Sequence, residues 1–237
     1  MQMASKRYTQ ALGLIDHKAS YSLDQAVAKL QGLPPVKFDE TVELSASLNI
    51  DPKKTDQVVR GTVVLPHGTG KVCKVLVFCK GEKESQAREA GADYVGAAEL
   101  MTKVQEGWLD FDVAIATPDM MRDVSRLGKI LGPRSLMPNP KAGTVTDDVA
   151  KAVQEVKRGR VEFKMDKLAN IHFVIGKRSF GPQQLIENGR VALEAIVHAK
   201  PASVKGHLIR RVSLSSTMSP GIALKTEGLE VETGSEI

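Results

Sequence analysis

The sequence predicts an α/β (α+β) protein with two domains: a split α+β domain formed by both chain ends and an inserted, Rossmann-like three-layer α/β domain. The strands expected near both ends alternate apolar and polar residues, which is typical of a sheet with one exposed face. The strands expected between residues 72 and 116 are apolar throughout and are separated by helices, which favours a parallel sheet covered on both faces. Neither terminal part has enough strands for a core of its own. We therefore expect residues 1–67 and 159–228 to form one domain and residues 68–158 the insert.

The two terminal parts together supply about four strands and two helices. Residues 22–30 begin with a serine cap, space apolar residues along one face and end at Gly32 and Pro34, which predicts a short amphipathic helix. Residues 38–50 alternate between apolar and polar side chains and predict a half-exposed strand. The other expected elements are strands over 160–165, 171–175 and 208–215, a turn over 166–170 and a helix opened by Pro182.

The middle part repeats strands and helices in turn. Cys73 and Cys79 lie in its first apolar run and are predicted to be reduced core thiols, since free cysteine is usually buried. Asp147 and Asp148 precede its last helix, where a carboxylate complements the helix dipole. Strands are expected over 72–79, 94–96 and 113–116, and helices over 82–90, 97–105, 118–131 and 146–157.

The positive charge is concentrated near the two ends of the chain. The whole sequence has 33 basic and 28 acidic residues, a net charge of +5. Residues 1–71 contain nine basic and seven acidic residues, residues 159–225 eleven and four, and residues 72–158 thirteen of each. The split domain therefore carries +2 and +7, or +9, while the insert is neutral. We expect a polyanion to bind the split domain. Residues 229–237 are expected to be an acidic, disordered tail.

The sequence lacks motifs for catalysis and for a bound cofactor. The glycine-rich segment 66–72 follows a leucine where a phosphate loop needs its first glycine, and no G-x-G-x-x-G follows the first strand of the insert. The five histidines are scattered, so no metal site is expected, and no serine or cysteine stands in a nucleophile motif. A nucleotide-dependent enzyme that uses the inserted sheet is therefore disfavoured. A DNA-binding regulator is disfavoured too, since it would need a helix-turn-helix with a basic recognition face.

The composition also limits where the protein works and what it binds. No run approaches the 18 apolar residues of a membrane span, and the N-terminus lacks a signal-peptide core. We expect a cytoplasmic protein that does not bind membranes. Aromatic residues make up 4% of the chain, so stacking platforms for single-stranded nucleic acid are not expected.

Two segments suit contact with RNA. Residues 127–145 form a loop dense in proline and glycine; it either holds Lys129, Arg134 and Lys141 towards phosphates or is a rigid loop packed on its own sheet. Residues 213–220 are rich in hydroxyl groups and include a methionine. Small hydroxyls can reach ribose 2′-hydroxyls in the minor groove of folded RNA, although an ordinary polar turn is also compatible with this segment.

These and other segments resemble the ribosomal protein L1 family, in order and over almost the whole chain, from about residue 5 to 224. The matching segments are KFDETVE at 37–43, RGTV at 60–63, PHG at 66–68, LGPR at 131–134, LMPNPK at 136–141, GTV at 143–145, DK at 166–167, IH at 171–172 and TM at 217–218.

The resemblance implies a protein that is no enzyme, needs no cofactor and is a monomer away from the ribosome. It implies binding to the mobile stalk of large-subunit (23S) rRNA beside the exit site for tRNA, with a role in the movement and release of that tRNA. It also implies repression of translation through a similar structure in the mRNA of its own operon. Carried over by match, the RNA contacts fall on Lys37, Phe38, Thr41, Glu43, Asp166, Lys167, Thr217 and Met218.

The chain departs from the family pattern at several positions. Ser219 and Ser135 replace frequent glycines, and Leu168 stands where threonine is common. Arg211 occupies a position that is often small and is expected to add a phosphate contact, so Arg211 and Ser219 join the predicted RNA site. The two connections between the domains predict a hinge, with Pro66, Gly68, Gly70 and Gly159 as its residues.

Overall fold

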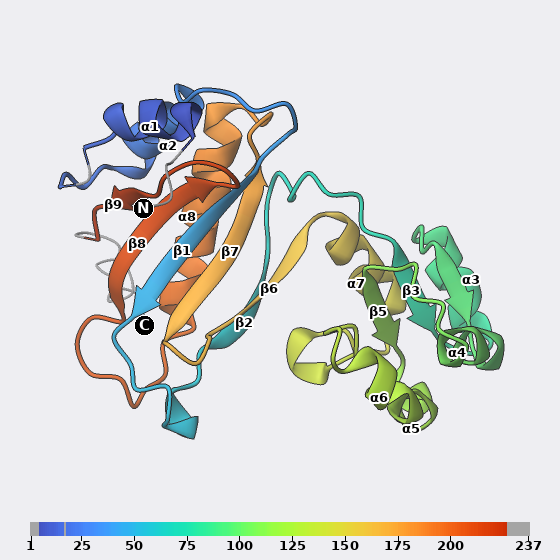
Figure 1. The fold of residues 1–237 in the computed structure, drawn as a ribbon. Helices are drawn as coiled ribbons and strands as arrows, with labels where there is room; N and C mark the ends of the chain where they lie inside the picture. Colours follow the sequence, from blue (N-terminus) through green and yellow to red (C-terminus); the bar gives the residue numbers. More distant parts are fainter. Residues whose placement is uncertain (1–4, 17, 227–237) are drawn as a thin grey trace. The chain divides into compact units, whose positions relative to one another are not determined.

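Figure 1 shows a computed structural model of the chain, which describes residues 5–16 and 18–226. The predicted acidic tail lies outside these residues. The described chain divides into two compact units. One contains the described residues up to Gly70 together with those from Val161 onward, and the other is Lys71–Arg160.

The first unit is built on a four-stranded antiparallel sheet whose strand order is β7-β1-β8-β9. Helices α2 (Leu23–Gln31) and α8 (Pro182–His198) pack on one face of this sheet (Figure 1). A second, two-stranded sheet pairs β2 with β6. The strands are β1 (Thr41–Leu48), β2 (Arg60–Val64), β6 (Arg160–Lys164), β7 (Asn170–Lys177), β8 (Ile209–Ser216) and β9 (Ile222–Leu224).

The sequence pattern explains these elements. In β1, Val42 and every second residue after it are buried against the helices, as the alternation of 38–50 predicted. Helix α2 begins with a capping box in which Ser22 and Gln25 each accept a hydrogen bond from the other's backbone N–H. Helix α8 begins at a proline and buries the predicted apolar stripe. The strands expected on either side of the turn 166–170 are confirmed, but they belong to different sheets.

Four elements of the first unit were not predicted: α1, the 3-10 helix η1 (Thr55–Gln57), β2 and β9. Helix α1 (Lys6–Gly13) is eight residues long and buries a single side chain, Ala11, so few of its residues belong to the core. Strand β9 has three residues, which is too short for alternation to identify it. It is a strand because it pairs with β8, from Val212 to Leu214.

The second unit has three layers. Its parallel sheet has the strand order β4-β3-β5, with β3 at Val75–Phe78, β4 at Tyr94–Gly96 and β5 at Val113–Ala116. Val75 and Val77 face helices α3 (Glu82–Glu89) and α7 (Val149–Lys157), while Leu76 and Phe78 face α4 (Ala98–Gln105) and the helical run 118–131. Helices therefore cover both faces of this parallel sheet, and the predicted mixed α/β fold class is confirmed.

The structure corrects three predicted elements of this unit, two at their first residue and one in its type of helix. Strand β3 does not begin at Val72, whose side chain is 93% exposed. Helix α7 begins at Val149, because the Asp148 side chain accepts a hydrogen bond from the Lys151 N–H and caps the helix. The helix predicted over 118–131 alternates 3-10 and α turns: η2 (Pro118–Met120), α5 (Met121–Val124), η3 (Ser125–Leu127) and α6 (Gly128–Leu131).

The two cysteines lie in the core of this unit. Cys79 is buried and Cys73 is half-buried, and both pack in the cluster between the sheet and α7. Burial raises the pKa of both thiols, which keeps them protonated and unreactive. Within 5–16 and 18–226, no helix is long and apolar enough to cross a membrane.

Candidate nucleic-acid interface

The four-stranded sheet leaves one face open, because its helices cover only the other (Figure 1). The strand register joins the side chains of this face into rows across the sheet. Ser47 of β1 lies between Asn170 and Arg211, and Ser45 lies between His172 and Ser213. The open face is therefore lined mainly by polar side chains. Its residues are Thr41, Glu43, Ser45 and Ser47 of β1, Asn170, His172, Val174 and Lys177 of β7, and Arg211, Ser213 and Ser215 of β8.

At one end of this face the loop 217–219 is held in place by residues around the start of β1. The Thr217 Oγ1 accepts a hydrogen bond from the Thr41 N–H at 3.1 Å. The Met218 N–H donates to Glu40 Oε1 at 3.0 Å, and the Met218 carbonyl accepts from Arg7 at 2.6 Å. With its backbone fixed on both sides, Met218 leaves 48% of its side chain exposed.

The carboxylate of Glu40 that anchors this loop is fully buried. It pairs with Arg178 at 2.5 Å, and Arg178 also donates to the carbonyl of Leu33. Just before it in the chain, Lys37 is exposed and Phe38 has 53% of its side chain exposed. This end of the face thus presents a cation and two apolar side chains on a rigid base.

Ser219 fits its position without strain. Among the described residues, only Ser135 and Ala169 combine a side chain with a positive φ angle. The Ser219 hydroxyl accepts a hydrogen bond from the Ser216 N–H at 2.8 Å and helps to close the turn. The replacement of the family's glycine at this position is therefore compatible with the local backbone.

The turn 166–170 lies at the opposite end of the open face. Asp166 Oδ1 accepts hydrogen bonds from the N–H groups of Leu168 at 2.8 Å and Asn170 at 2.7 Å. The bond from Asn170 is the main reason that the pKa of the Asp166 carboxyl is lowered. Asp166 shapes the turn, while Lys167 is exposed and Leu168 has 78% of its side chain exposed.

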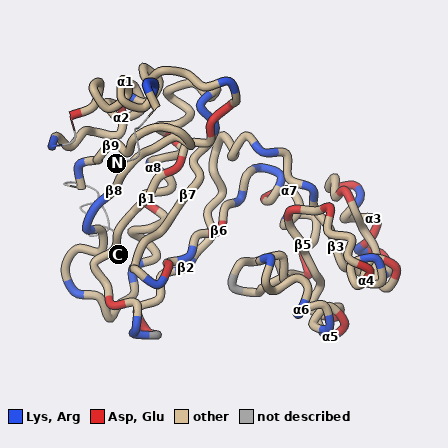
Figure 2. The backbone as a smooth tube through the Cα atoms, viewed as in Figure 1, with Lys and Arg blue, Asp and Glu red and all other residues tan. Residues whose placement is uncertain are grey.

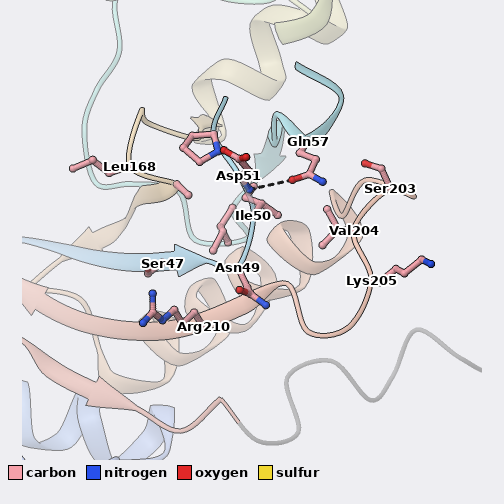
Figure 3. Close-up of a pocket in the computed structure, with 13 residues that line it drawn as sticks. Ser47, Asn49, Ile50, Asp51, Gln57, Leu168, Ser203, Val204, Lys205 and Arg210 are labelled. Atoms are coloured by element: carbon pink, nitrogen blue, oxygen red, sulfur yellow. Dashed lines mark hydrogen bonds between the residues drawn. The ribbon is translucent and has the colours of Figure 1, made fainter. Parts of the chain in front are cut away.

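A cavity of about 490 Å³ opens beside this turn, at the end of β1 (Figure 3). Ser47 belongs both to its wall and to the open face, and Leu168 lines it from the turn. Gln57 is oriented by the hydrogen bond that its Oε1 accepts from the Asp51 N–H at 3.0 Å. The other lining residues are Leu48, Asn49, Ile50, Pro52, Ala169, Ser203, Val204, Lys205 and Arg210.

The predicted site residues therefore form two clusters. Thr217 lies over Thr41 at the start of β1, while the turn that follows Asp166 lies beside Ser47 near its end. Six residues of extended strand separate these ends, about 20 Å. The first cluster is Lys37, Phe38, Thr41, Glu43, Thr217, Met218 and Ser219; the second is Asp166, Lys167 and Arg211.

The sequence prediction missed the residues that connect the two clusters. His172 lies between them, 3.2 Å from the Ser45 hydroxyl and 3.3 Å from the carboxylate of Glu43. Ser45 and Ser47 occupy the polar positions of the alternating strand. The same alternation that identified the core side of β1 was therefore the signal that could have found them.

Residues 27–220 match the model of the Ribosomal protein L1p/L10e family. The chain belongs to this family. The large ribosomal subunit protein uL1 of Kosmotoga olearia is 57% identical over 224 residues, which cover 94% of this chain and 97% of that relative. The resemblance noted in the sequence is confirmed.

Membership of the L1 family distinguishes between two predicted classes of function, an RNA-binding ribosomal protein and a nucleotide-dependent enzyme. The family consists of structural ribosomal proteins, so the hypothesis of a nucleotide-dependent enzyme is wrong and the partner class is ribosomal RNA. Membership of this family also agrees with the predicted cytoplasmic location. Over the described part of the chain, no group of histidine, cysteine and carboxylate side chains is placed to hold a metal ion.

The predicted hinge residues of this L1 family member lie at the junctions of the two units. The buried Asn188 of α8 accepts a hydrogen bond from the His67 N–H at 3.2 Å and donates to the Gly68 carbonyl at 2.9 Å, so the backbone beside Pro66 is tied to the first unit. The three predicted hinge glycines all have positive φ angles: 66° at Gly68, 74° at Gly70 and 101° at Gly159. A larger side chain would strain the backbone at these positions.

The proline-rich loop of the insert is packed by its apolar residues. Leu131 is fully buried, and Leu136 and Met137 pack against the same cluster. The Asn139 N–H donates to Thr144 Oγ1 at 2.8 Å, which closes the loop. These contacts favour the rigid-loop interpretation for the apolar residues. Its cations Lys129 and Arg134 are nevertheless exposed; the Lys141 side chain lies outside the described structure.

Proposed function

We propose that this protein, a structural constituent of the large ribosomal subunit, binds the mobile stalk of 23S rRNA. The observation that carries the proposal is the open, hydroxyl-rich sheet face with a positioned loop at each end. Minor grooves of folded RNA display 2′-hydroxyls, which small hydroxyl and carboxylate groups can bind. The uL1 relative, by its name a protein of the large subunit, supports this placement.

Each part of the face has a chemical role in this proposal. Lys37 and Lys167 contact phosphates at the two ends, and Arg211 adds a third cation at the same end as Lys167. Figure 2 shows basic residues distributed over the strands and loops of this unit. Phe38 and Met218 pack on sugar or base surfaces. The hydroxyls of Thr41 and Thr217, the Glu43 carboxylate and Ser219 complete the predicted contacts, with Asp166 holding the second loop in shape.

We further propose the finer functions that the family resemblance implies. The same face would bind a mimic of the rRNA site in the mRNA of the protein's own operon and thereby repress its translation. On the ribosome, bending at Gly70 and Gly159, beyond the backbone that Asn188 anchors at His67 and Gly68, would assist the movement and release of exit-site tRNA. Off the ribosome the protein would act as a monomer.

The test is binding to a stalk fragment of 23S rRNA, compared with an unrelated hairpin of the same length over a series of salt concentrations. We expect a clear preference for the stalk fragment and an affinity that falls as salt rises. Equal binding to both RNAs, or affinity that does not respond to salt, would contradict the proposal. A leader fragment of the protein's operon mRNA, used as competitor, should displace the rRNA fragment if autoregulation operates.

A further inference from the structure

The second unit carries a row of cations on one side of the helical run 118–131. The opposite side is anchored in the core, where Met120, Val124, Leu127 and Leu131 are fully buried. These buried residues recur at intervals of three and four, as a helix with one buried face requires. The side chains on the side of the run opposite to these four residues are therefore held towards solvent by the packing of the core.

Arg122, Arg126 and Lys129 occupy the solvent side of this run, and all three are exposed. Their spacing of four and three residues places them on one face, in a row about 10 Å long. Arg134 follows in an exposed turn. We call these four residues the cation stripe.

One acidic residue of the run is engaged elsewhere, because Asp123 lies 3.8 Å from Lys80. No ion pair to any of the four stripe cations is found in the part of the chain that the structure describes. The cations are therefore available to an external partner.

The insert has no net charge, but its acidic and basic residues are concentrated in different segments. Residues 82–112 contain eight acidic and three basic residues, whereas residues 118–134 contain two acidic and four basic ones. Figure 2 shows the basic residues of α5 and α6 apart from the acidic groups around α3 and α4. A polyanion approaching this unit would be directed to the stripe.

We infer that the cation stripe binds the sugar–phosphate backbone of RNA, as a contact separate from the sheet face of the first unit. The inference rests on the proposed function in taking RNA as the partner. Three of the four side chains are arginines, whose planar donor groups suit phosphate oxygens. The stripe itself exposes no aromatic or large aliphatic side chain, as a helix that inserts into a membrane surface would.

The experiment uses the full-length protein with Arg122→Gln, Arg126→Gln and Lys129→Gln combined. We expect binding to the stalk fragment of 23S rRNA, extended by a duplex arm of arbitrary sequence, to weaken about tenfold at moderate salt. The slope of log affinity against log salt concentration, which is negative, should become shallower by roughly one for each lost phosphate contact. Because the three side chains face away from the core, the thermal unfolding midpoint should not change.

The matched control is Arg88→Gln, Lys103→Gln and Lys151→Gln, which removes the same charge from exposed positions on α3, α4 and α7. It should leave the affinity and the salt slope unchanged. The charge-conserving variant with Arg122→Lys, Arg126→Lys and Lys129→Arg should bind nearly as well as the unmodified protein. A loss as large in the control as in the stripe variant would overturn the inference.

A second measurement, with a tRNA transcript in place of the extended stalk fragment, identifies the source of the phosphates. Weaker binding only to the extended fragment places the stripe on ribosomal RNA, and weaker binding only to the transcript places it on tRNA. Unchanged binding to both RNAs overturns the inference. If the unmodified protein does not prefer the stalk fragment, the proposed function itself is wrong. If it does prefer that fragment and Met218→Ala weakens the binding, but the stripe variant binds both RNAs normally, only the inference about the cation stripe is wrong.

Discussion

Ser135 and Ser219 stand where the L1 family frequently has glycine, but their backbones differ. Ser135 has a φ angle of 57°, in the left-handed region that disfavours a side chain, whereas Ser219 does not. The Ser219 hydroxyl also accepts a hydrogen bond from the Ser216 N–H. The same substitution at the two positions should therefore have opposite effects.

We expect Ser135→Gly to stabilise the second unit by about 0.5–1 kcal/mol, the relief of left-handed strain less the greater chain entropy of glycine. Ser219→Gly should destabilise the first unit by about 1 kcal/mol, because it removes a hydrogen bond. Urea unfolding of the two variants beside the unmodified protein measures both values. Changes of the same sign would contradict this interpretation.

Asp166 acts on the turn that presents Lys167, and its effect depends on pH. Its pKa is lowered in the folded protein by the backbone hydrogen bond from Asn170. A lowered folded-state pKa contributes stability that is present above the unfolded-state pKa and is lost as pH falls through the folded-state pKa. Asp166→Asn should therefore lower stability at neutral pH, and the difference should narrow below about pH 4. Urea unfolding at several pH values tests this; a difference independent of pH would contradict it.

At the scale of elements, the buried pair of Glu40 and Arg178 joins the start of β1 to the loop 217–219. Glu40→Gln leaves a buried guanidinium without its countercharge and should cost about 3 kcal/mol. It should also loosen the Met218 backbone and weaken RNA binding. Adding Arg178→Met should recover part of the stability, since it removes the unpaired charge. Denaturant unfolding of the single and double variants measures this coupling; additive losses would contradict it.

The sequence predicted those elements whose own residues carry the signal. The alternation around Val42 gave the buried side of β1, and the apolar stripe gave α8. Strand β9 is formed by pairing with β8 and with Tyr21, partners that no local pattern reveals. Val72 was predicted to be part of a strand because it is apolar. The parallel pairing of β3 with β5 begins only at Val75, which apolar composition alone does not predict.

At the scale of the whole molecule, net charge predicted the proposed RNA surface only coarsely. Counting residues gave a basic split domain and a neutral insert, yet the insert segregates its charges along the chain. Matched motifs likewise named Asp166 and Thr217 as parts of one site. Their separation along β1 follows from the register of β1 with β7 and β8, which only the folded sheet defines.

This separation gives a prediction for the interface as a whole. Met218 and Lys167 lie at opposite ends of the open face and share no hydrogen-bonding partner, so their contributions to RNA binding should add. We expect Met218→Ala to weaken binding to the stalk fragment about tenfold without changing the salt slope. Lys167→Gln should weaken binding less, and it should make the negative slope of log affinity against log salt concentration shallower by about one.

The double variant should lose the sum of the two binding free energies to within about 0.5 kcal/mol. Arg190→Gln is the matched control for Lys167→Gln, because it removes an exposed cation from α8, the helix that covers the opposite side of the sheet. Its affinity and salt slope should equal those of the unmodified protein. Strong coupling between Met218 and Lys167 would mean that the RNA engages one end of the face only after the other is bound, since about 20 Å of sheet excludes direct contact between them.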